Sequence, residues 1–241
     1  MAARYQLLCL SFGLLALLLL VGCRQDGRAP IRSGVPILSD CSDAPNLASW
    51  FPTDTLSPEA ETRALREEFV SYLTSAGERP FGCGDRREGY RVTWLPTNRP
   101  AQIATIVRDD RGWLATGTRF DDPRPINAGS PPRTVERRFE STPDDAKVAA
   151  LISCVAAAKL WTAAAWQASR ETDDGDVILV ELRAAGTYRA LFRAQVSDLN
   201  FQEVAATLLT AAGLSPVREL SDWDRVHNPN RLRCGAQLNA R

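Results

Sequence analysis

An apolar segment lies near the N-terminus, from Leu7 to Val21, and is interrupted only by Ser11 and Gly13. A helix of about 15 residues is ~22 Å long, which is shorter than the ~30 Å hydrocarbon core of a bilayer. The Leu-rich run has no polar face, so it is not typical of a helix that packs on a soluble core. We therefore expect residues 1–22 to be a signal peptide. A short buried helix or a true membrane anchor are the alternatives.

The end of this segment carries the most specific motif of the sequence. Leu20-Val21-Gly22-Cys23 resembles the bacterial lipobox, in which an apolar residue, a small or β-branched residue and a small residue precede a cysteine. The resemblance implies diacylglyceryl transfer to the Cys23 thiol, cleavage before Cys23 and acylation of the new amine; cleavage at an ordinary signal-peptidase site is the competing expectation. Two or three acyl chains hold a protein on a bilayer far more firmly than one. In lipoproteins an Asp after the cysteine favours the inner membrane, so Arg24 implies the outer membrane, facing the periplasm.

The mature chain divides into a tether and one folded domain. Residues 23–44 show neither a period of 2 nor one of 3.6, and we expect them to form an irregular tether. Such a segment has an average reach of about 25 Å. The folded domain is then expected to span 45–241.

Within that domain the pattern alternates between helical and strand signals. Helices are expected at about 58–76, from Thr142 onward, and at about 200–212. Strands are expected at Tyr90–Leu95, Ala101–Arg108, Gly112–Phe120, Arg133–Glu140, Val177–Arg183 and Thr187–Ala194. The order α-ββββ-α-ββ-α predicts an α+β fold, a mostly antiparallel sheet with helices packed on one face.

The helix boundaries can also be predicted. Thr142 is expected to cap the second helix, with Pro143 in its first turn and Asp145 completing a capping box. An Ala-rich run to Trp161 and Trp166 is expected to continue this helix or to follow it closely. Asn200 is the expected cap of the last helix.

Several stretches resemble a group of proteobacterial proteins with no assigned activity. They include Tyr90–Leu95, the helix ending near Trp161, the strand with Glu181, Gly186–Arg189 and the closing run at 209–214. The resemblance spans about 90–214. It supports the fold prediction and implies no activity.

Six cysteines are present, of which Cys9 leaves with the signal and Cys23 is the lipidation site. An even number of remaining cysteines in an exported chain favours two disulfides. The four candidates are Cys41, Cys83, Cys154 and Cys234. The favoured pairing is Cys41–Cys83 with Cys154–Cys234; the other pairings, and a buried free thiol at Cys154, stay open.

The sequence contains no recognisable catalytic or metal-binding motif. His227 is the only histidine, and no C-x-x-C spacing accompanies it, so we expect no metal site and no catalytic triad. Acid pairs occur at 109–110, 121–122, 144–145 and 173–176. Each has an explanation as a turn, loop or helix N-terminus, although the last could bind a divalent cation.

The tryptophans divide into two groups. Trp94, Trp161 and Trp166 fall in or beside expected regular elements, and we expect them in the core. Trp50-Phe51 and Trp223 lie in irregular segments, where they either cover the edges of the core or form an exposed binding patch.

Charge and composition bound the function. The chain has 29 basic and 29 acidic residues, and removing residues 1–22 takes away only Arg4, which leaves a net charge of −1. This balance is not typical of a nucleic-acid-binding protein. We expect a non-enzymatic envelope lipoprotein that binds the membrane through its lipid and recognises an envelope protein, without a small-molecule cofactor. A carboxylate-based hydrolase, or an immunity or inhibitor protein against a periplasmic enzyme, are the alternatives.

Overall fold

The computed structural model describes residues 35–36, 50–52, 55, 60–84, 88–97, 99–123, 134–167, 176–194, 198–216 and 234. All of them lie in the unit that spans Ser33–Arg241. Within these ranges, every helix is too short or too polar to cross a bilayer. The predictions for the signal peptide and for Cys23 concern residues outside the described ranges.

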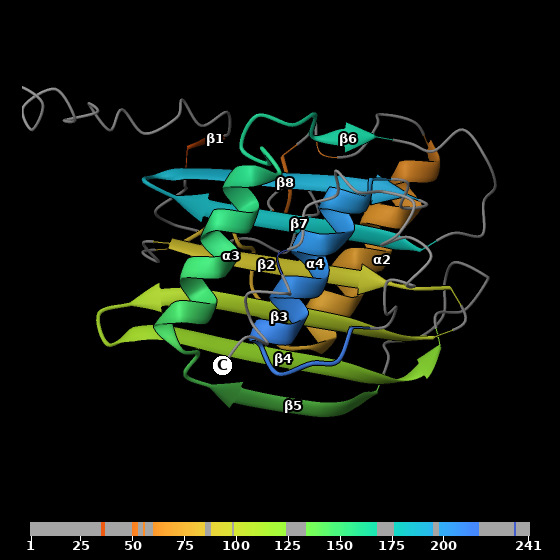
Figure 1. The fold of residues 1–241 in the computed structure, drawn as a ribbon. Helices are drawn as coiled ribbons and strands as arrows, with labels where there is room; N and C mark the ends of the chain where they lie inside the picture. Colours follow the sequence, from red (N-terminus) through yellow and green to blue (C-terminus); the bar gives the residue numbers. More distant parts are fainter. Residues whose placement is uncertain are drawn as a thin grey trace, which may run out of the picture. The chain divides into compact units, whose positions relative to one another are not determined.

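The fold is α+β, and the order of its long elements is the predicted α-ββββ-α-ββ-α. The long strands are β2 (Glu88–Leu95), β3 (Pro100–Asp109), β4 (Gly112–Pro123), β5 (Val135–Ser141), β7 (Val177–Ala184) and β8 (Thr187–Ala194). They form an antiparallel sheet in the order β8-β7-β2-β3-β4-β5. The β7–β8 hairpin therefore adds to the sheet beside β2, which becomes a central strand (Figure 1).

Two strands of two residues each extend the sheet beyond β8. β1 (Val35–Pro36) pairs antiparallel with β8, and β6 (Trp166–Gln167) pairs parallel with it. Within the expected tether, 23–44, the structure describes only residues 35–36, which pair with β8. A strand of two residues is too short to show the alternation of apolar and polar residues from which strands are predicted.

The helices cover both faces of the sheet, so the prediction that they share one face is wrong. α2 (Ala60–Ser75) packs on one face, where its Phe69 and Leu73 join a core cluster with Leu179. α3 (Asp145–Ala157) and α4 (Leu199–Ala211) pack on the other face, in a second cluster that includes Val180. Figure 1 shows α3 and α4 in front of the sheet and α2 behind it.

The strands themselves carry the signal for this two-sided burial. Val177, Ile178, Leu179 and Val180 follow one another without a polar residue, and all of β7 is buried. A strand with one face in water alternates apolar and polar residues, whereas a strand covered on both faces is apolar throughout. The two faces are called below the α2 face and the α3/α4 face.

Both predicted caps lie at different residues from those expected. Asp144 is the N-cap of α3, where its Oδ1 accepts a hydrogen bond from the backbone N–H of Ala146 at 2.7 Å. Asp198 is the N-cap of α4 and accepts from the N–H of Phe201 at 3.0 Å. The predictions of Thr142 and Asn200 are therefore wrong. Thr, Asn and Asp are all favoured at an N-cap, so residue type alone does not show which of several neighbouring residues is the cap.

α3 ends at Ala157, before the stretch that leads to Trp161. Lys159 adopts a left-handed conformation with φ 54°, and the N–H of Leu160 bonds back to the carbonyl of Val155. This is the bonding pattern of a helix that closes on a left-handed residue. Leu160 and Trp161 follow the turn and are buried in the core of the α3/α4 face.

Candidate functional site

Two charged residues face one another in the middle of the sheet. Arg91 of β2 and Glu181 of β7 are paired in register, and both are 0% exposed. Arg91 Nε donates to Glu181 Oε2 at 2.5 Å, and Arg91 Nη2 donates to Glu181 Oε1 at 2.8 Å. Such a two-point pairing of guanidinium with carboxylate is both strong and geometrically specific.

A tyrosine and the segment after α2 complete this buried network. The hydroxyl of Tyr188 in β8 donates to Glu181 Oε1 at 2.7 Å. Arg91 Nη1 donates to the carbonyl oxygen of Arg79 at 2.8 Å and lies 3.4 Å from Glu78 Oε2. The guanidinium also lies over the ring of Phe81, 4.8 Å from its centroid. The network therefore joins three strands to the segment that leaves α2.

Burial and neighbouring charges determine the protonation states of Tyr188 and Arg91. Burial raises the pKa of Tyr188 well above its ordinary value, and the neighbouring Glu181 carboxylate raises it further. Burial alone would lower the pKa of Arg91, but Glu181 and Glu78 outweigh it and raise the pKa of the guanidinium. Tyr188 therefore stays neutral and donates, while Arg91 stays charged.

A second buried arginine, Arg183 of β7, holds the loop that contains Cys83. Arg183 Nη1 donates to the carbonyl of Cys83 at 2.7 Å, and Arg183 Nη2 donates to the carbonyl of Gly84. Arg183 is 2% exposed. Cys83 is itself disulfide-bonded, while Cys41, its favoured partner from sequence, lies outside the described residues.

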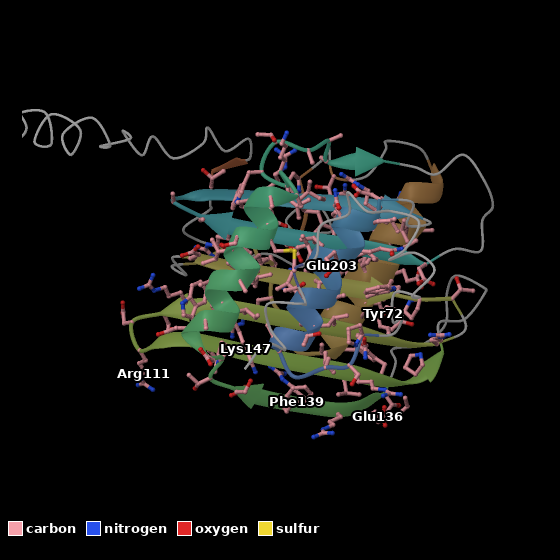
Figure 2. The ribbon with its side chains drawn as sticks, viewed as in Figure 1. Tyr72, Arg111, Glu136, Phe139, Lys147 and Glu203 are labelled. Carbon is pink, nitrogen blue, oxygen red and sulfur yellow. A yellow bond between two sulfur atoms is a disulfide. The ribbon has the colours of Figure 1, made fainter. Side chains whose placement is uncertain are left out.

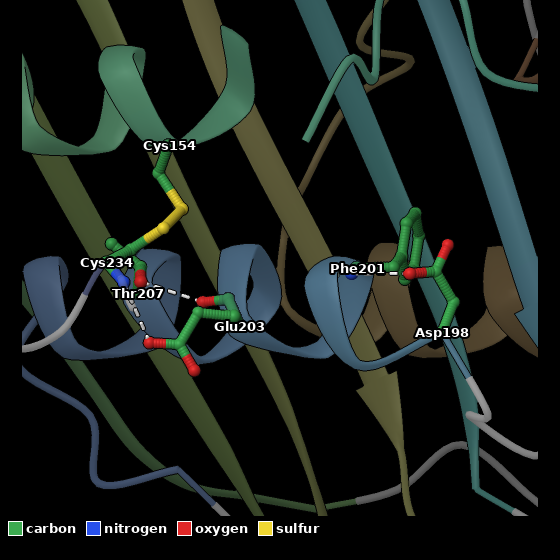
Figure 3. The surroundings of a disulfide bond; sticks show 6 residues. All are labelled: Cys154, Asp198, Phe201, Glu203, Thr207 and Cys234. Carbon is green, nitrogen blue, oxygen red and sulfur yellow. Dashed lines mark hydrogen bonds between the residues drawn. A yellow bond between two sulfur atoms is a disulfide. The ribbon is translucent and has the colours of Figure 1, made fainter. Parts of the chain in front are cut away.

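A disulfide joins α3 to the C-terminal part of the chain, as Figure 3 shows. It links Cys154 with Cys234 across 80 residues of sequence, and this is the pairing favoured from the sequence. The backbone N–H of Cys234 also donates to Glu203 Oε1 of α4 at 3.0 Å. Residue 234 is thus fixed to both helices of the α3/α4 face.

The acidic residues named from the sequence lie at a turn, in a strand, at a helix N-terminus and at the start of a strand. Asp109 closes the β3–β4 turn by accepting from the N–H of Arg111 at 2.7 Å, and Asp144 caps α3. Asp121 is exposed in β4. Asp176 accepts from the indole N–H of Trp94 at 3.2 Å. Asp109, Asp144 and Asp176 therefore each have a hydrogen-bonding role within the fold.

Other candidate residues fall into the core or outside the described ranges. Trp50 and Phe51 are buried in the core of the α2 face, so they cover that core and do not form an exposed patch. Trp94 and Trp161 are buried in the core of the α3/α4 face. The positions outside the described residues are Cys23, Cys41, Trp223, His227 and 173–175.

Sequence reasoning did not single out Arg91, Arg183 or Tyr188 as members of one cluster. The signal was present, because each charged side chain interrupts a strand whose neighbouring residues are apolar. The pairing of β2 with β7, which brings Arg91 to Glu181, joins residues 90 positions apart and is not visible in local patterns.

The geometry of the network favours a structural role. A general acid or base has to come within hydrogen-bond reach of a substrate. Arg91 and Glu181 have no exposed surface, and their bonds are directed at one another, at Tyr188 and at a backbone carbonyl. The network holds the segment after α2 on the sheet.

Among the described residues, no three His, Cys, Asp or Glu side chains lie together in a way that could hold a metal ion. Neither a known protein family nor a curated protein matches this chain.

Proposed function

We propose that this chain is an envelope lipoprotein, anchored by lipid on Cys23, whose α+β domain binds a protein partner at the membrane surface. The motif Leu20-Val21-Gly22-Cys23 at the end of the apolar segment supports the anchor. Arg24, rather than an Asp, follows the cysteine and favours the outer membrane.

The observation that carries the proposal is the Cys154–Cys234 disulfide. Disulfides form and persist in oxidising compartments such as the periplasm and are rare in the cytosol. Cys83 also forms a disulfide. A chain that begins with an apolar leader and folds around disulfides is best accounted for by export.

A binding role fits the described residues better than a reaction does. Tyr188, whose pKa is raised well above its ordinary value by burial, belongs to a network that is closed to solvent. A carboxylate-based hydrolase needs two carboxylates that converge on one bond. Asp109 and Asp144 are instead engaged in a turn and in a helix cap.

Metabolic labelling with a clickable fatty acid tests the anchor. We expect label on the wild-type chain and on Cys9→Ser, because Cys9 is removed with the signal peptide. We expect no label on Cys23→Ser. Label on Cys23→Ser, or an unlabelled wild-type chain, would show that the proposal is wrong.

A further inference from the structure

β5 is the terminal strand at one end of the sheet and, among the described residues, pairs with β4 alone. Arg137, Arg138, Glu140 and Ser141 are exposed along it. Figure 2 shows the strand with Glu136 and Phe139 labelled. A terminal strand has a row of backbone N–H and C=O groups that another strand can pair with.

The register of the sheet shows which residues present those groups to the open side. Asp109 and Gly112 close a two-residue hairpin and are therefore a hydrogen-bonded pair. Because bonded and non-bonded pairs alternate, the pairs of β4 with β5 that are bonded include Gly117 with Phe139. Arg138 and Glu140 consequently direct their backbone groups away from β4, toward the open side.

The charges along β5 select one way for two copies to pair. In an antiparallel pair related by a twofold axis, outward-directed residues have to meet outward-directed residues. If at least three residues of each strand are to pair, the axis passes through one of residues 136–140. Every choice except Phe139 places two identical charges opposite one another, which is destabilising.

The remaining register is complementary on both sides of the axis. It places Arg138 of each copy opposite Glu140 of the other, in hydrogen-bonded positions, and Phe139 opposite Phe139. The side chain of Arg138 is already oriented, because its Nη1 donates to the carbonyl of Ala76 at the end of α2 at 2.7 Å. An oriented side chain loses less freedom when it binds.

We propose that this protein forms a homodimer through antiparallel pairing of β5 with β5, centred on Phe139. The partner is a second copy because, when two Arg138-Phe139-Glu140 segments pair antiparallel, each arginine lies opposite a glutamate. One seven-residue strand is a small contact area, so the dimer is weak and depends on concentration. The inference rests on β5 and is independent of the lipid anchor.

Cysteine cross-linking of the full chain in detergent-solubilised membranes tests the register. Arg137 and Ser141 are exposed and would lie opposite one another across the interface. We expect the double variant Arg137→Cys, Ser141→Cys to give a cross-linked dimer, and the parent chain and each single variant to give none. A cross-link with Arg137→Cys alone, or none with the double variant, overturns the proposal.

Charge reversal tests the pairing itself. In the double-cysteine chain, Glu140→Arg places arginine opposite Arg138 twice, and we expect the dimer affinity to fall by about tenfold. Glu136→Arg makes the same change of charge on the same strand but outside the paired positions. We expect it to leave the cross-linked fraction unchanged. Equal effects of the two variants would contradict the Arg138–Glu140 pairing.

Discussion

Arg91 and Glu181 lie directly opposite one another on β2 and β7, and both residues are fully buried. This relationship fixes how the β7–β8 hairpin joins the sheet. A slip of two residues would place Arg91 opposite Leu179 or opposite a second arginine, Arg183. Either arrangement leaves a buried charge without its partner, which is costly.

Removal of one partner of this pair should destabilise the fold strongly. Glu181→Gln keeps the shape of the side chain but leaves the charge of Arg91 buried without a carboxylate. We expect the free energy of unfolding in urea to fall by about 3–5 kcal/mol. Glu67→Gln is the matched control, since Glu67 forms an exposed pair with Arg63 and should change stability by less than about 1 kcal/mol. Similar values for the two variants would contradict the assigned role.

Tyr188 gives the fold a dependence on alkaline pH. Its pKa is raised in the folded state, so the folded chain keeps a proton that the unfolded chain loses above pH ~10. The stability is therefore fully present below pH ~10 and falls as the pH rises, by up to ~1.4 kcal/mol per pH unit.

Urea unfolding of the wild type and of Tyr188→Phe between pH 9 and about 11 measures this contribution. We expect the difference in stability between the two chains to shrink as the pH rises. A difference that is constant with pH would show that Tyr188 does not titrate as assigned.

Local signals predicted most of the elements, but not how they are arranged around the sheet. The strand at Thr187–Ala194 has the predicted bounds, because its turn and flanking residues are local. The apolar run Val177–Val180 contained the information that both faces of the sheet are covered, yet the prediction put the helices on one face. Which helix covers which face depends on contacts between distant segments.

The buried network around Arg91 and Glu181 was likewise only partly predictable from the sequence. A charged residue in an apolar strand was visible at Arg91 and at Glu181. Their partnership depends on the placement of β7 beside β2, and no local pattern encodes it. The Cys154–Cys234 pairing could be favoured from sequence because few cysteines compete for it.

The position of the α3 cap is directly testable. Asp144→Ala removes the oxygen that accepts from the N–H of Ala146, and we expect it to cost about 1 kcal/mol of stability. Thr142→Ala, at the residue predicted from sequence, should change the free energy of unfolding by less than ~0.5 kcal/mol. A larger effect at Thr142 would restore the original prediction.

The disulfide should contribute substantially to stability. With a sequence separation of 80 between Cys154 and Cys234, the loop-closure entropy predicts a loss of about 4.5 kcal/mol in the double variant Cys154→Ala, Cys234→Ala. Substitution is preferable to a reductant, because Cys83 is also disulfide-bonded. A loss below about 1 kcal/mol in urea unfolding would show that the crosslink does not constrain the unfolded chain.

Mass spectrometry of the N-terminal peptide from membrane-extracted protein tests the lipid anchor on Cys23. We expect a mature chain that begins at Cys23, with the mass of a diacylglyceryl group and of an acyl group on the amine. An unmodified Cys23, or a chain that still contains residues 1–22, would contradict it.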